Sequence, residues 1–117
     1  MRRLAPFLAL ALAAGTVPAL ADGSYSGASS VAGGRGAACA GVTPMNAYVS
    51  GSSIELSGYA YEGSGDRATG TVKADGTFSA VMASPKGDVT FNGRVGAHNV
   101  EAQWKGPDCW GAVDLNK

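Results

Sequence analysis

Apolar side chains recur at every second position through most of the chain after residue 22. Val89, Phe91 and Val95 alternate with polar neighbours, and residues 99–105 repeat this pattern. A period of two is typical of a β-strand, in which successive side chains point to opposite faces. The pattern therefore predicts strands that bury one face and expose the other. Helices are not expected, because glycine interrupts every candidate segment.

Turn-forming segments divide this pattern into eight expected strands. Clusters of Gly, Ser, Asn, Asp and Pro separate the strands at regular spacing. A Gly- and Ala-rich segment, residues 31–38, is predicted to be a flexible connection. The strands are expected at about 23–30, 43–50, 53–61, 69–74, 77–83, 88–95, 99–105 and 109–116.

The turns also predict how neighbouring strands pair. A three-residue loop ending in a bulge pairs Val72 with Phe78 and keeps both apolar side chains on one face. The next hairpins are expected to set Phe91 against Trp104, and Trp104 against Cys109. Because each consecutive pair works as an antiparallel hairpin, we expect an all-β meander. It closes either as a small barrel or as a two-sheet sandwich.

Residues 1–21 have the anatomy of a secretory signal peptide. Two arginines are followed by an apolar stretch and then by a small-x-small cleavage site that ends at Ala21. Cleavage there would leave residues 22–117 as a single β domain, either periplasmic or secreted. The apolar stretch is shorter than the ~20 residues of a membrane-spanning helix, so no membrane span is predicted.

The two cysteines, Cys39 and Cys109, are expected to form a disulfide, since export supplies an oxidising compartment. Neither belongs to a C-x-x-C motif, and the chain has one histidine. The sequence therefore predicts no metal site and no cofactor. Without the two leader arginines, seven basic and nine acidic side chains remain, a net charge of −2. These charges are scattered singly, which argues against nucleic acid as a partner.

Few residues are candidates for catalysis. His98 lies in an expected hairpin turn, and Glu55, Glu62 and Asp66 are carboxylates near one another in sequence. Paired carboxylates can hydrolyse glycosides, but these occupy an outward strand position and a Gly-rich loop. We interpret all four as surface residues, and we do not expect an enzyme.

Exposed aromatic residues are the best indication of function. Tyr48, Tyr59, Tyr61 and Trp110 fall on the outward parity of their strands. Aromatic side chains on a rigid sheet can anchor a binding face. The sequence therefore favours an exported, non-enzymatic β-module that binds a protein or a glycan.

Two resemblances add to this interpretation. The stretch Ser57-Gly58-Tyr59-Ala60-Tyr61 resembles the S-G-x-x-Y pattern of periplasmic inhibitors of C-type lysozymes, which are eight-stranded antiparallel barrels. This resemblance implies that Ser57 and the two tyrosines bind a cell-wall hydrolase, which is the alternative function. That family's second motif is echoed only by Trp104-Lys105-Gly106, without the expected tyrosine.

The whole chain also resembles small exported proteobacterial proteins with two cysteines and D-G-[ST]-[YF] repeats. Asp22-Gly23-Ser24-Tyr25 and Asp75-Gly76-Thr77-Phe78 carry this resemblance. It implies a β fold and no particular activity.

Overall fold

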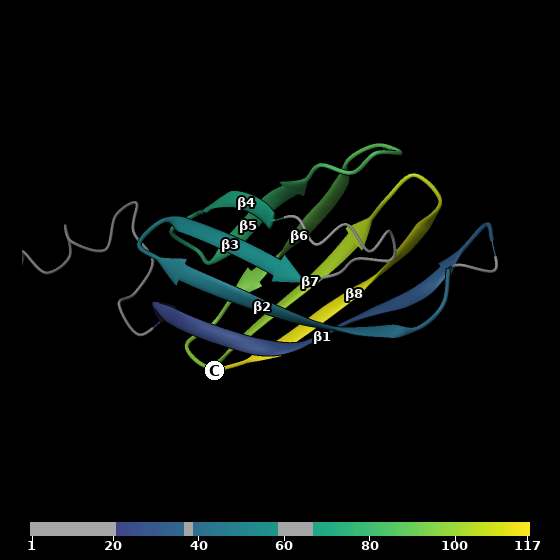
Figure 1. Cartoon of the computed structure of the whole chain (residues 1–117). Coiled ribbons are helices and arrows are strands. Elements are labelled where there is room, and N and C mark those ends of the chain that lie inside the picture. Colours follow the sequence, from purple (N-terminus) through teal and green to yellow (C-terminus); the bar gives the residue numbers. More distant parts are fainter. Residues whose placement is uncertain (1–20, 37–38, 59–66) are drawn as a thin grey trace, which may run out of the picture.

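The eight strands of the chain form a closed antiparallel barrel (Figure 1). The structure, a computed structural model, describes residues 21–36, 39–58 and 67–117. Each strand pairs with its neighbours in sequence, and β8 pairs with β1 to close the sheet. The barrel, not the two-sheet sandwich, is thus the correct closure. The strands are β1 (Gly23–Gly34), β2 (Val42–Ser50), β3 (Ser53–Gly58), β4 (Arg67–Val72), β5 (Thr77–Met82), β6 (Val89–Val95), β7 (Asn99–Lys105) and β8 (Cys109–Asn116).

The expected strands agree closely with these bounds, but the flexible connection predicted for residues 31–38 is wrong in its first part. Residues 31–34 are not a flexible connection, because they continue β1 and pair with the start of β8. Val31 lies opposite Gly111 and Gly34 opposite Cys109, with a register shift between Val31 and Gly33. A Gly- and Ala-rich segment predicts a loop when no partner strand is known. In the closed barrel, β8 is the partner strand of residues 31–34. The expected end of the third strand, residues 59–61, lies outside the described residues.

The strand registers follow the turns. Val72 lies opposite Phe78, and Phe91 lies opposite Trp104, as predicted. The predicted pairing of Trp104 with Cys109 is wrong, because Trp104 lies opposite Gly111. The amide of Gly106 donates to the carbonyl of Cys109 (2.8 Å), which centres the turn on Pro107-Asp108. Proline, with its fixed φ, favours the first central position of such a turn. The shift of two residues leaves the same face of β8 buried.

Apolar side chains from all eight strands fill the barrel. The largest fully buried ones are Trp104, Tyr25, Phe91, Met45, Ile54, Leu56, Met82 and Leu115. Burial of each such side chain contributes roughly 1.5–3 kcal/mol to folding. The hydroxyl of Tyr25 lies within hydrogen-bond distance of the carbonyl oxygens of Ala21 and Gly96.

Inward-facing glycines let the strands bend tightly. A Cβ atom added at Gly111 would lie 1.9 Å from the carbonyl oxygen of Ser30, and one at Gly93 would lie 2.1 Å from that of Glu101. No side chain fits where backbones approach this closely, so these positions require glycine. Gly27 and Gly70 make similar approaches.

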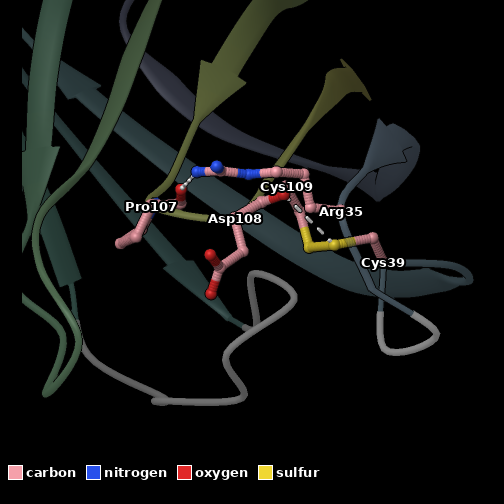
Figure 2. Close-up of a disulfide and its surroundings, with 5 residues drawn as sticks. All are labelled: Arg35, Cys39, Pro107, Asp108 and Cys109. Carbon is pink, nitrogen blue, oxygen red and sulfur yellow. Dashed lines mark hydrogen bonds between the residues drawn. A yellow bond between two sulfur atoms is a disulfide. The ribbon is translucent and has the colours of Figure 1, made fainter.

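The predicted disulfide is present and lies at one end of the β1–β8 seam (Figure 2). Cys39 and Cys109 have Cα atoms 5.4 Å apart. The amide of Arg35 donates to the carbonyl of Asp108 (2.9 Å), and its guanidinium donates to the carbonyl of Pro107 (3.3 Å). The disulfide and these bonds together fasten the end of β1 to the β7–β8 turn. A disulfide is compatible with an oxidising, extracellular location. Within the described ranges, no helix is long and apolar enough to cross a membrane.

Candidate functional site

The outer surface of the barrel carries the candidate binding residues, because the interior is filled by the core. Large apolar side chains are exposed at four described positions: Val42 (69%), Tyr48 (55%), Trp110 (48%) and Val81 (44%). Tyr48 and Trp110 are therefore exposed, as the alternation of their strands predicted. Both are candidate anchors for a partner.

Tyr48 borders a hollow of about 330 Å³ on the outer face of β1, β2 and β3. It lies between Ser24 on β1 and Glu55 on β3 in the sheet register. The predicted residue Ser57 lines the same hollow. Its other outward residues are Ser26, Asn46, Asn116 and Lys117.

The hollow exists because the outward residues at the start of β1 are small. Ser24 and Ser26 leave a depression between the larger side chains of β2 and the end of β8. The Lys117 ammonium lies 5.6 Å from the centre of the Tyr25 ring, at one side of the hollow. Glu55 forms an ion pair of 3.4 Å with Arg67, and both side chains are exposed. Such pairs contribute little to stability, so the carboxylate can also accept a hydrogen bond from a ligand.

Trp110 does not join Tyr48, although the barrel closes. It lies opposite Gly33 of β1, whereas Tyr48 lies opposite Ser24. These two positions of β1 are nine residues apart, or about 30 Å along the strand. The predicted aromatic residues therefore belong to two separate surfaces. Tyr59 and Tyr61 lie outside the described residues.

Two further hollows, of about 410 and 560 Å³, lie on the outer face of β6, β7 and β8. Trp110, Lys105 and Thr90 line the first, and Arg94, Glu101 and Asp114 line the second. Both are lined by Asn92, Gln103 and Ala112. The sequence interpretation missed these polar residues, although the register of 89–95 with 99–105 would have placed Asn92 opposite Gln103.

The predicted surface role of the titratable residues agrees with their positions where they are described. Glu55 faces Arg67, and the carbonyl of His98, in the β6–β7 turn, accepts a hydrogen bond from the Lys117 amide (2.8 Å). Glu62 and Asp66 lie outside the described residues. In the described part of the chain, no three His, Cys, Asp or Glu side chains gather as metal ligands would.

Two groups have shifted pKa values, and both shifts have structural causes. Burial, and then the nearby carboxylate of Asp22, raises the pKa of the Tyr25 hydroxyl. Hydrogen bonds from the side chain and backbone of Thr77 lower the pKa of Asp75 in the β4–β5 turn.

No protein-family model, curated protein or solved structure matched the chain.

Proposed function

We propose that the chain is an exported, non-enzymatic β-barrel module that binds a glycan through the hollow around Tyr48. The observation that carries this proposal is one half-exposed aromatic ring beside a depression lined by polar side chains. The face of an aromatic ring attracts the C–H groups on the apolar side of a sugar. Hydroxyl, amide, carboxylate and ammonium groups then provide donors and acceptors for the sugar hydroxyls.

The rigidity of the barrel supports this proposal. Tyr48 and Ser57 lie on adjacent strands of a closed sheet, and Val49 and Leu56 behind them are fully buried. A site on such strands keeps its geometry before the ligand arrives, which lowers the entropic cost of binding.

The experiment compares Tyr48→Ala with Val81→Ala. Both remove an exposed apolar side chain from an outward strand position, but Val81 does not line the hollow. Soluble cell-wall glycan fragments are titrated into each protein by calorimetry. We expect Tyr48→Ala to weaken binding by about 30-fold or more, with melting temperatures unchanged in both variants. Equal affinity of the two variants, or no binding by the wild type, would contradict the proposal. Capture of a purified protein by the wild type without glycan would favour a protein partner.

Export is part of the proposal and has its own test. Apart from Ala21, the expected leader lies outside the described residues. Cleavage after Ala21 would remove one acceptor of the Tyr25 hydroxyl and leave the Gly96 carbonyl, 3.0 Å away. Intact-mass measurement of the exported protein is expected to show Asp22 at the N-terminus. A start more than a few residues away would contradict the predicted site.

Inhibition of a lysozyme-type hydrolase is the second candidate. It is supported by the eight-stranded closed barrel with a disulfide, which the resemblance through Ser57-Gly58 implies. A lysozyme activity assay with increasing amounts of the protein tests it. We expect suppression that is lost in Ser57→Ala, and undiminished lysozyme activity would exclude this candidate.

A further inference from the structure

Two adjoining hollows lie on the outer face of β6, β7 and β8, and Trp110 lines the smaller one. Asn92, Gln103 and Ala112 line both hollows, so the two meet at these residues and are treated together as one groove. The Tyr48 hollow shares no lining residue with it.

The sheet register arranges the groove in three rows that run across the strands. The first row is Thr90, Lys105 and Trp110, the second is Asn92, Gln103 and Ala112, and the third is Arg94, Glu101 and Asp114. Adjacent rows are two residues apart along each strand, so the outer rows are separated by about 13 Å. A ligand that contacts all three rows must therefore be elongated and run parallel to the strands.

Trp110 provides a flat platform at one end of the groove. Its side chain is 48% exposed. Its ring lies against the backbone of Gly33, where an added Cβ atom would be 2.9 Å from the indole. The missing side chain at Gly33 lets the indole rest on β1, which limits its movement. An indole held in this way can stack against the C–H groups of a sugar ring.

The middle row offers hydrogen bonds. Asn92 and Gln103 lie directly opposite each other on β6 and β7. Each amide has two N–H donors and a carbonyl acceptor, and neither forms a side-chain hydrogen bond to another described residue. The small side chain of Ala112 leaves space beside them. Neighbouring hydroxyl groups of a sugar match this arrangement of donors and acceptors.

The charges at the two ends of the groove differ in sign. Lys105, beside Trp110, has no carboxylate within ion-pair distance among the described residues. At the other end, Glu101 and Asp114 lie directly opposite each other. The Arg94 guanidinium lies in the same row and donates to the carbonyl of Asp75 (3.0 Å), so this end carries two carboxylates against one cation. An anionic group is therefore favoured more at the Trp110 end, where Lys105 is the cation, than at the far end.

We propose that this groove binds a short linear glycan whose acidic sugar stacks on Trp110 and pairs its carboxylate with Lys105. The next sugar along the groove is neutral and hydrogen-bonds to Asn92 and Gln103. A chain with a carboxylate on every sugar binds less well, because its later units approach Glu101 and Asp114. This site is independent of the Tyr48 hollow and does not rest on the function proposed for it.

Three oligosaccharides of equal length test the proposal on the wild-type protein. One carries a single glucuronic acid at one end of an N-acetylglucosamine chain, the second contains only N-acetylglucosamine, and the third contains only galacturonic acid. We expect the singly acidic chain to bind at least about tenfold more tightly than either of the others. The readout is calorimetry, together with acrylamide quenching of tryptophan fluorescence. Trp104 is buried and Trp110 is exposed, so a bound ligand should protect Trp110 from the quencher.

Matched variants separate the proposed contacts from general electrostatics. Lys105→Gln should remove the preference for the singly acidic chain over the neutral one, whereas Lys73→Gln, in the β4–β5 turn, should keep it. Trp110→Ala should weaken binding about 30-fold, and Trp110→Tyr, which keeps a ring over Gly33, should retain part of the affinity. Melting curves check that each variant folds.

Several results would overturn the proposal. These are no binding of the singly acidic chain, equal binding of the neutral chain, tightest binding of the fully acidic chain, or unchanged affinity in folded Trp110→Ala and Lys105→Gln. Failure of the Tyr48 experiment alone would leave this site supported, because the two hollows have no lining residue in common.

Discussion

Replacement of Gly111 by alanine is expected to destabilise the barrel at its closing seam. The added methyl group would lie 1.9 Å from the carbonyl oxygen of Ser30 on β1 and 2.7 Å from the ring of Trp104. Real Cβ contacts are essentially never shorter than 3.0 Å, so the β1 backbone would have to move by about 1 Å. The neighbouring pair of Ser30 with Ala112 belongs to the β1–β8 ladder. The movement would therefore disturb the hydrogen bonds that close the sheet.

The expected loss of unfolding free energy depends on which atoms the added methyl group meets. Overpacking of a core costs about 1–3 kcal/mol, and more when no neighbour can move. We expect a loss near ~3 kcal/mol for Gly111→Ala, since one of the two contacts is to backbone. At the urea dependence usual for small domains, this loss lowers the unfolding midpoint by about 1–3 M.

Gly36→Ala is the matched control for this prediction. It makes the same chemical change at a position where the added Cβ atom has nothing within 4 Å. Its stability should change by less than about 0.5 kcal/mol, or rise slightly. Urea unfolding followed by circular dichroism measures both variants. A loss under ~1 kcal/mol for Gly111→Ala would refute the tight β1–β8 approach on which the reasoning rests.

Three further predictions concern the disulfide, the core and the pH dependence. The double variant Cys39→Ala and Cys109→Ala should lose about 4 kcal/mol of unfolding free energy, since the cross-link spans 70 residues. Equal stability of this variant and the oxidised wild type in urea would contradict that. Phe91→Ala should lower the unfolding free energy by about 3–5 kcal/mol, because the ring is fully buried. A loss under ~1 kcal/mol would mean that Phe91 does not belong to the packed core. The pKa of Tyr25 is raised above 10.0, first by burial and then by Asp22. The unfolded chain therefore loses this proton first, and stability falls as the pH rises from about 10 through the raised pKa. Tyr25→Phe lacks this contribution, so its unfolding midpoint should fall less between about pH 8 and pH 11. An equal fall of the unfolding midpoint in the wild type and in Tyr25→Phe over this pH range would disprove the contribution of Tyr25.

Local chemistry was sufficient to predict the strands and most of their pairing. The alternation around Phe91 and the glycine after Asp75 depend on neighbours only a few residues away. These neighbours fix which face of a strand is buried and how a hairpin turns. The exposure of Tyr48 and Trp110 followed from the same alternation. The two-residue error opposite Trp104 arose where Pro107 decided the position of the turn.

The closure of the sheet and the arrangement of the surface were decided by tertiary structure. Whether β8 meets β1 depends on the accumulated bend of all eight strands, which includes backbone approaches such as that at Gly93. That closure gave the small residues 31–34 a partner strand and set the register that separates Trp110 from Tyr48. Alternation assigns a side chain to a face, but only the register of non-local strands assigns its position along that face. Alternation along the chain is therefore sufficient to locate the strands and their buried faces, whereas the register between distant strands is needed to find which exposed residues share a groove.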